Sequence, residues 1–166
     1  MKELEMKENI LTVAQKGEAI LGLVALDVAE HEFGQSYLVE FVRAMHATML
    51  ERMGVGIAAP QVYLSKRIII VASKPNPRYP DAPLMEPITM INPIILEQSE
   101  STLSGEEGCL SVPQERGIVL RSESIKVSYR TLHGEQVEQV FKGFPARIVQ
   151  HEIDHLNGIL FVERVD

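Results

Sequence analysis

Residues 150–158 read Gln-His-Glu-Ile-Asp-His-Leu-Asn-Gly, a His-Glu-x-x-His pattern inside an apolar-periodic run. On a helix, side chains four positions apart are neighbours on one face, so His151 and His155 could bind one metal ion together. Glu152 would lie beside them, where it could handle the proton of a metal-bound water. The alternative is a solvated helix in which two histidines occur by chance, and the rest of the sequence has to decide between these interpretations.

Two helices are predicted, and the motif lies in the second. Residues 143–156 form this second helix, with Pro145 in its first turn and Gly158 just after its end. The first helix is predicted for residues 35–53, where apolar side chains recur every three or four positions. Gly54 is expected to end it.

The other apolar segments predict strands that follow one another along the chain. Pro93 indicates that one of them lies at a sheet edge or contains a bulge. Because helices do not alternate with the strands, the predicted fold class is α+β. Mostly antiparallel β-sheets are expected around the C-terminal helix, with the long helix in the N-terminal half. The predicted strands are residues 67–72, 88–95, 119–120, 124–130 and 136–141.

Length, composition and charge limit what this sequence can encode. Residues 1–166 are expected to form a single domain, and the proline-rich segment 73–83 is interpreted as a surface loop rather than a domain linker. The formal net charge is −7 and no Lys/Arg cluster is present. These features argue against a nucleic-acid surface and against a polybasic membrane patch.

The sequence also indicates a cellular compartment. Its apolar runs are too short to span a membrane, and residues 1–9 do not lead into a segment typical of a signal peptide. Cys109 is the single cysteine, which excludes an internal disulfide and suits a reducing compartment. A cytoplasmic protein is therefore expected.

Two histidines leave a metal ion short of protein ligands, because a catalytic site normally has three of them plus water. In other His-Glu-x-x-His enzymes the third ligand lies downstream, but Phe161 stands where a third histidine would be, and Glu163 is the one glutamate that follows. The other histidines look like surface or turn residues. Cys109, which follows a glycine and precedes an apolar segment, is therefore the candidate ligand. Its alternative role is that of a small buried apolar side chain.

Three motifs, in this order, resemble those of the peptide deformylases. Residues 54–61, Gly-Val-Gly-Ile-Ala-Ala-Pro-Gln, are similar to the first motif of that family, Gly-x-Gly-φ-Ala-Ala-x-Gln. Residues 107–111, Glu-Gly-Cys-Leu-Ser, match the second, and residues 150–155 match the third. The resemblance implies a metal-dependent hydrolase that removes the formyl group from N-formylmethionine at the N-terminus of newly made polypeptides and releases formate.

The resemblance also implies the metal site. Cys109, His151 and His155 would be the ligands of one Fe²⁺ ion per chain, for which Zn²⁺, Ni²⁺ or Co²⁺ could substitute. A mixed thiolate and imidazole site suits all four metals. A bound metal would lower the pKa of its water to about 7 and so provide the hydroxide that attacks the formyl carbon.

By the same resemblance, Glu152 is the general base and then the general acid. Gln61 and the backbone N–H of Leu110 would stabilise the oxyanion, at about 3 kcal/mol per donor.

Substrate contacts are expected from four residues, again by resemblance. Val55, Gly56 and Gly108 would present backbone to an extended peptide, and Arg116 would lie near the mouth of the site, paired to Glu107. The substrate side chain would need an apolar pocket, with candidate linings Val55, Phe144 and Ile148. N-formylmethionyl nascent peptides are the expected partners, ribosome association is a further candidate, and no nucleic-acid or membrane partner is indicated.

Two other functions remain open from the sequence. A metalloendopeptidase would cleave internal bonds of unformylated peptides, although a cysteine ligand argues against it. A non-enzymatic binding module would normally have lost a ligand or the base, and none is lost here. The loop at residues 75–87 is an insertion relative to the shortest members of the family, and its role is open.

Overall fold

The structure is a computed structural model that describes residues 10–165. It contains two α-helices, α2 (Ser36–Glu51) and α3 (Phe144–Leu156). Four short 3₁₀ turns accompany them: η1 (Ala19–Gly22), η2 (Glu30–Glu32), η3 (Ala59–Val62) and η4 (Phe161–Glu163). No helix within the described residues is long and apolar enough to cross a bilayer.

The strands form two antiparallel sheets. Five of them pair in the order β1-β2-β3-β6-β7, and β4 pairs with β5 in a separate two-stranded sheet. The predicted α+β class, with antiparallel sheets and two helices, is therefore confirmed. The strands are β1 (Gly56–Ala58), β2 (Ile68–Val71), β3 (Ile88–Gln98), β4 (Thr102–Cys109), β5 (Val112–Ser122), β6 (Ser124–Arg130) and β7 (Gln136–Lys142).

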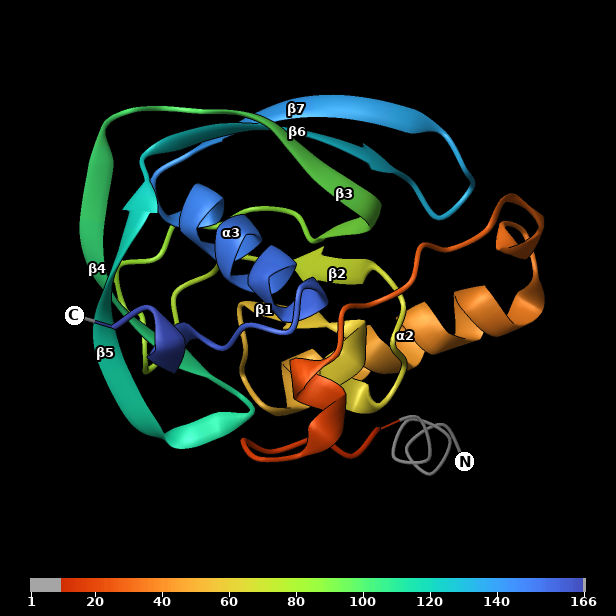
Figure 1. Cartoon of the computed structure of the whole chain (residues 1–166), viewed down its shortest axis with the longest axis horizontal. Helices are drawn as coiled ribbons and strands as arrows, with labels where there is room; N and C mark the ends of the chain where they lie inside the picture. Colours follow the sequence, from red (N-terminus) through yellow and green to blue (C-terminus); the bar gives the residue numbers. More distant parts are fainter. Residues whose placement is uncertain (1–9, 166) are drawn as a thin grey trace.

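Helix α3 lies near the centre of the molecule, with β6 and β7 above it, β4 and β5 to one side and α2 at the lower right (Figure 1). The alternation of side chains along β2 explains how both helices are held. Ile68 and Ile70 pack in the same core cluster as α2, whereas Ile69 and Val71 pack in the cluster that includes α3. All four residues of β2 are buried because each face of the strand meets one of these clusters.

Helix α3, which carries the His-Glu-x-x-His motif, is almost completely buried. Every residue of this helix from Ala146 to Leu156 is buried, although the stretch includes charged and polar side chains. Buried polar groups need partners, because an unpaired one costs about 1–3 kcal/mol. The polar face of α3 therefore has to be satisfied by β4, β5 or a ligand rather than by bulk water.

One local expectation is confirmed and two need correction. Pro93 was predicted to mark a sheet edge or a bulge, and the bulge is found: β3 is a central strand whose register shifts between Ile91 and Ile94. Helix α2 ends at Glu51, and the residue with a positive φ after it is Met53 rather than Gly54. Strand β4 was not predicted, since its glycines and paired glutamates do not show the alternation of a half-buried strand.

Candidate metal centre

Helix α3 brings three chemically active side chains to one buried face. His151, Glu152 and His155 are only 8%, 5% and 1% exposed. The two imidazole rings meet edge to face, with centroids 5.1 Å apart, as expected for positions i and i+4 of a helix.

Cys109 comes to this face from the end of β4. Its Sγ lies 3.3 Å from Nε2 of His155. Ligand atoms of Cys109, His151 and His155 all lie within 4.8 Å of one another. Tetrahedral coordination with M–N of about 2.0 Å and M–S of about 2.3 Å separates ligand atoms by about 3.3–3.8 Å, so the three residues fit one metal ion. Of the other histidines, His46 is half-buried on α2 rather than solvated.

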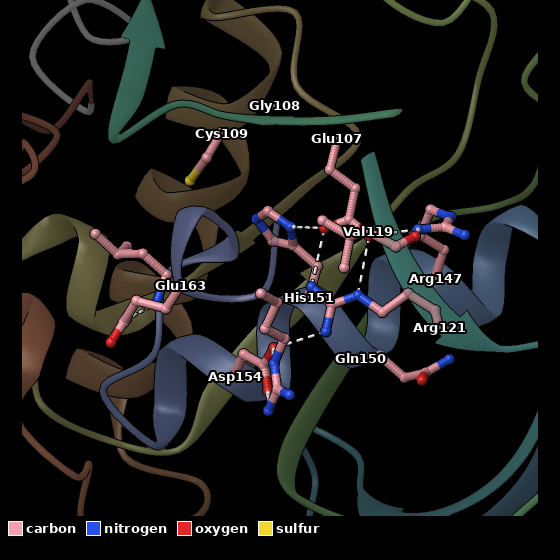
Figure 2. A network of polar contacts seen from close by, with 12 residues as sticks. Glu107, Gly108, Cys109, Val119, Arg121, Arg147, Gln150, His151, Asp154 and Glu163 are labelled. Carbon is pink, nitrogen blue, oxygen red and sulfur yellow. Dashed lines mark hydrogen bonds and ion pairs between the residues drawn. The ribbon is translucent and has the colours of Figure 1, made fainter. Parts of the chain in front are cut away.

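Glu107 orients one of these ligands. Nδ1 of His151 lies 2.9 Å from Oε1 of Glu107, which leaves the opposite ring nitrogen, Nε2, for a metal (Figure 2). This carboxylate–histidine pairing is the usual way in which proteins fix the ring and tautomer of a metal ligand.

The Glu107 carboxylate is itself held by two arginines. Arg121 donates to both of its oxygens at 2.9 Å, and Arg147 donates to Oε2 at 2.7 Å. Arg121 also donates to Asp154 at 2.6 Å (Figure 2). Arg164 donates to the same carboxylate. We refer to these five residues, Glu107, Arg121, Arg147, Asp154 and Arg164, as the arginine–carboxylate network.

The electrostatics of the site suit a cation. Burial raises the pKa of the Cys109 thiol, but the neighbouring His155 and His151 outweigh burial and hold this pKa well below its usual range. Burial also raises the pKa of Glu152 to about 7. Oε1 of Glu152 is buried and has no hydrogen-bond partner within residues 10–165. A thiolate, two imidazoles and an unpartnered carboxyl oxygen at one point are what a divalent metal and its water would satisfy.

Gln61 faces this centre from η3. Its side-chain carbonyl accepts a hydrogen bond from the N–H of Ala58 at 2.9 Å. Its amide nitrogen lies 3.4 Å from Sγ of Cys109 and donates to Oγ of Ser111 at 3.0 Å. Leu110 follows Cys109 directly in the turn between β4 and β5. Gln61 and Leu110 therefore both lie beside Cys109, although Gln61 and Cys109 are 48 positions apart in the sequence.

The expected substrate residues line one pocket with the metal centre. Val55, Gly56 and Gly108 are among its walls, together with Phe144 and Ile148. A Cβ on Gly56 would lie 2.6 Å from Oε2 of Glu152 and 2.8 Å from Cγ2 of Ile148, so any side chain here would have to displace one of them. The pocket encloses about 480 Å³, including open solvent at its mouth.

Arg116 differs from its expectation. It pairs with Glu106, with Nε 2.8 Å from Oε1, and not with Glu107. The two glutamates are neighbours on β4, and because successive side chains of a strand point to opposite faces, only one can turn inward. Arg116 lines a second pocket beside the first.

Sequence reasoning missed several members of the site. Arg121 and Asp154 were not assigned a role, and neither was Ser111 or Tyr79, although Tyr79 lines the pocket. The sequence did hold a signal for Arg121. It is a charged residue at the apolar end of a strand, and if that strand is buried, the charge needs a partner of opposite sign. Tyr79 had no such signal, because it lies in a loop whose position depends on tertiary contacts.

Comparison with known proteins agrees with this geometry. The sequence model of the polypeptide deformylase family matches residues 10–166. Peptide deformylase 2 of Shewanella oneidensis is 47% identical over 154 residues, which are 93% of this chain and 83% of the relative.

Solved structures agree as well. A crystal structure of the class I type b peptide deformylase of Acinetobacter baumannii superposes with a TM-score of 0.93 at 66% identity, and the match covers 95% of this chain and 99% of that one. A second structure of that protein, with Met-Ala-Ser bound, gives a TM-score of 0.92 at 66% identity over 94% and 98% of the two chains. This chain therefore belongs to the peptide deformylase family, the metal-dependent hydrolases that remove the N-formyl group from newly made polypeptides.

Proposed function

We propose that the pocket around Cys109, His151 and His155 is the site at which this deformylase hydrolyses N-formylmethionyl peptides. The observation that supports the proposal most directly is the convergence of these three ligand atoms within 4.8 Å beside the buried Glu152. Each of the three side chains comes from a motif that the family resemblance had singled out.

The three residues would hold one Fe²⁺ ion, through Sγ of Cys109 and Nε2 of each histidine. Zn²⁺, Ni²⁺ or Co²⁺ could take the same place, since thiolate and imidazole ligands suit all of them. When bound, such an ion acidifies water and so makes a hydroxide nucleophile available near neutral pH. Anaerobic purification followed by metal analysis tests the assignment, and a fully active sample with less than one equivalent of divalent metal per chain would contradict it.

Glu152 is the proton carrier of the reaction. It takes a proton from the attacking water and passes it to the amine nitrogen as the C–N bond of the formamide breaks, which releases formate and a free N-terminus. Its burial supports this role, because a carboxyl whose pKa is raised to about 7 can exist in both protonation states at neutral pH.

Gln61 and the backbone N–H of Leu110 stabilise the oxyanion that forms on the formyl oxygen. The Gln61 amide is buried and held by Ala58 and Ser111, so its orientation is set before the substrate arrives. Donors held in advance in a water-poor site are each worth about 3 kcal/mol in the transition state.

The peptide would lie along Val55, Gly56 and Gly108, with its methionine side chain against Phe144 and Ile148. Binding of Met-Ala-Ser by the Acinetobacter baumannii relative supports a methionyl peptide as the ligand class. Arg116, at the neighbouring pocket, would meet the peptide farther from the formyl group.

The wider setting is part of the proposal. Residues 1–166 would form one catalytic domain, which a single cooperative unfolding transition would support. The enzyme would act in the cytoplasm on N-formylmethionyl nascent chains and could associate with the ribosome, because these chains are made there. Cell fractionation and cosedimentation with translating ribosomes test both points.

The decisive experiment compares Glu152→Ala with wild-type enzyme in a formate-release assay on formyl-Met-Ala-Ser. Formate release should fall by at least about 10²-fold while the metal stays bound, because the three ligands are unchanged. Full activity in the metal-loaded variant would contradict the role of Glu152. Cleavage of internal bonds in unformylated peptides by the wild type would favour the endopeptidase instead.

A further inference from the structure

The loop between β2 and β3 contributes a wall to the pocket. Two cavities lie side by side at this wall, and both are lined by Arg78, Tyr79, Phe144 and Arg147. The first cavity leads to the metal centre. The second encloses about 990 Å³, open solvent included, and its other walls are more polar. Residues that line both cavities form the partition between them.

The loop supplies Arg78 and Tyr79 to this partition, and the side chain of Tyr79 is held by three contacts. Its hydroxyl oxygen accepts a hydrogen bond from the N–H of Gly108 at 2.9 Å. Its ring packs on Phe144, with centroids 4.9 Å apart and planes at 51°. The Arg116 guanidinium lies over the same ring, 4.9 Å from its centroid. Three contacts of this kind give a loop residue a fixed position.

Arg116 is fixed in turn. Glu106 pairs with it at 2.8 Å, which leaves the guanidinium face free to cover Tyr79. Gly105 lies beside this wall and provides room for Arg147, since a Cβ there would approach the Arg147 guanidinium to 2.8 Å. A side chain at position 105 would therefore have to displace the Arg147 guanidinium.

We propose that Tyr79 is a specificity-determining residue, whose ring separates the substrate side-chain pocket from the second cavity and so limits the length of the side chain that the enzyme accepts. The inference rests on the proposed placement of the substrate methionine against Phe144 and Ile148. With Tyr79 shortened, the two cavities join, and a longer side chain can extend past Phe144 into the second.

The test compares two substrates that differ in the length of the first side chain. One is formyl-Met-Ala-Ser, and the other carries 2-aminodecanoic acid in place of methionine. In Tyr79→Ala, the ratio of kcat/KM for the long substrate to that for the methionyl substrate should rise at least about tenfold, since a few methylenes in an apolar pocket are worth that much. Tyr79→Leu, which keeps an apolar contact with Phe144, should shift the ratio in the same direction but less.

Three controls sharpen the result. Tyr79→Phe keeps the ring and should keep the wild-type ratio. Leu84→Ala changes a side chain of the same loop that is 81% exposed and lines neither cavity, and should also keep it. Ser104→Phe, added to Tyr79→Ala, places a ring in the second cavity and should restore discrimination against the long substrate. Metal content and thermal stability are measured for each variant.

The inference is overturned if folded, metal-loaded Tyr79→Ala and Tyr79→Leu discriminate between the two substrates as the wild type does. It is also overturned if Tyr79→Phe widens the specificity as much as Tyr79→Ala. A wild-type enzyme that releases no formate from formyl-Met-Ala-Ser contradicts the proposed function itself, and that outcome is visible before any variant is made.

Discussion

Two buried glutamates, Glu107 and Glu32, show how differently one residue type can be used in this molecule. Their side chains are 3% and 9% exposed. The pKa of Glu107 stays well below its usual range because, although burial raises it, Arg121 and His151 more than compensate. The pKa of Glu32 is lowered to about 2, first by its hydrogen bond from the Tyr37 hydroxyl and then by a backbone N–H.

Their partners explain the difference in consequence. Glu107 is paired with two buried arginines, so its loss would leave Arg147 without its counter-ion, while Arg121 would keep Asp154. Glu32 is bonded by the Tyr37 hydroxyl, by the N–H of Ala29 and by a single cation, Lys66, which is 27% exposed. The first glutamate therefore couples the fold to the metal site, and the second only closes the turn before α2.

The largest effect is expected from Glu107→Ala. Removing one partner of a buried ion pair costs about 3–5 kcal/mol, because the remaining charge stays buried. Urea unfolding should show this loss, and metal binding should weaken because His151 loses its partner. Glu107→Gln, the matched control, keeps an acceptor for His151 and should weaken metal affinity by about 10–100-fold. An unchanged metal affinity in both variants would mean that Glu107, like Glu32, does not influence the metal site.

Gly56→Ala tests whether the site is sensitive to geometry when no charge is altered. The added Cβ would meet Glu152 at 2.6 Å and displace it. A displacement on the scale of 1 Å lowers kcat by about 10²-fold, while metal content should not change. Gly22→Ala is the matched control, because nothing lies within 4 Å of its added Cβ. Equal kcat in the two variants would contradict the prediction.

Glu32→Gln should lower the free energy of unfolding by about 1–2 kcal/mol at pH 7 and leave formate release and metal content unchanged. Because the folded pKa of Glu32 is below the unfolded value of 4.5, its contribution is complete above that value. The contribution is lost as the pH falls from about 4.5 toward 2. Urea unfolding of both proteins at pH 7, 4.5 and 3 should show the difference shrinking at acid pH, and a constant difference would count against the charge of Glu32.

The smallest effect is expected from Tyr37→Phe. This change removes one hydroxyl donor to Glu32 and leaves the N–H of Ala29 and Lys66 in place. A loss of about 1 kcal/mol is expected at pH 7, with no effect on kcat. A larger loss than in Glu32→Gln would mean that Tyr37 stabilises the protein mainly through other contacts.

Much of the fold followed from local patterns. The periodicity of residues 35–53 and 143–156 predicted both helices to within two residues at each end. All five predicted strands fall on observed strands, although only residues 119–120 of β5 were found. Errors arose where tertiary structure overrides local preference. Pro93 left an edge strand and a bulge open, and only the pairing of the sheet shows that it is a bulge in a central strand. The glycines of β4 obscured a strand whose role is to bring Cys109 to α3.

The candidate site was predicted in the same uneven way. The motifs named candidates for the metal ligands, the base and the oxyanion donors. In the structure Gln61, Cys109, Leu110, His151 and Glu152 line one pocket, and His155 lies beside Cys109 and His151. The expected ion pair between Arg116 and Glu107 is not formed. Arg116 pairs with Glu106 instead, because the pleat of β4 turns Glu106 toward it. Arg121 had a local signal, as a charged residue within an apolar strand, whereas Tyr79 had none.

The sequence by itself determined what is set within a few residues: that 143–156 form a helix, that His151 and His155 share one of its faces, and that three motifs of one family are present. The tertiary structure decided which distant groups meet. Cys109 reaches His155 across 46 positions, and Glu107 meets Arg147 across 40. The physical reason is that helical spacing depends on backbone hydrogen bonds between near neighbours, whereas these contacts exist only because α3 is buried against β4, β5 and the central sheet.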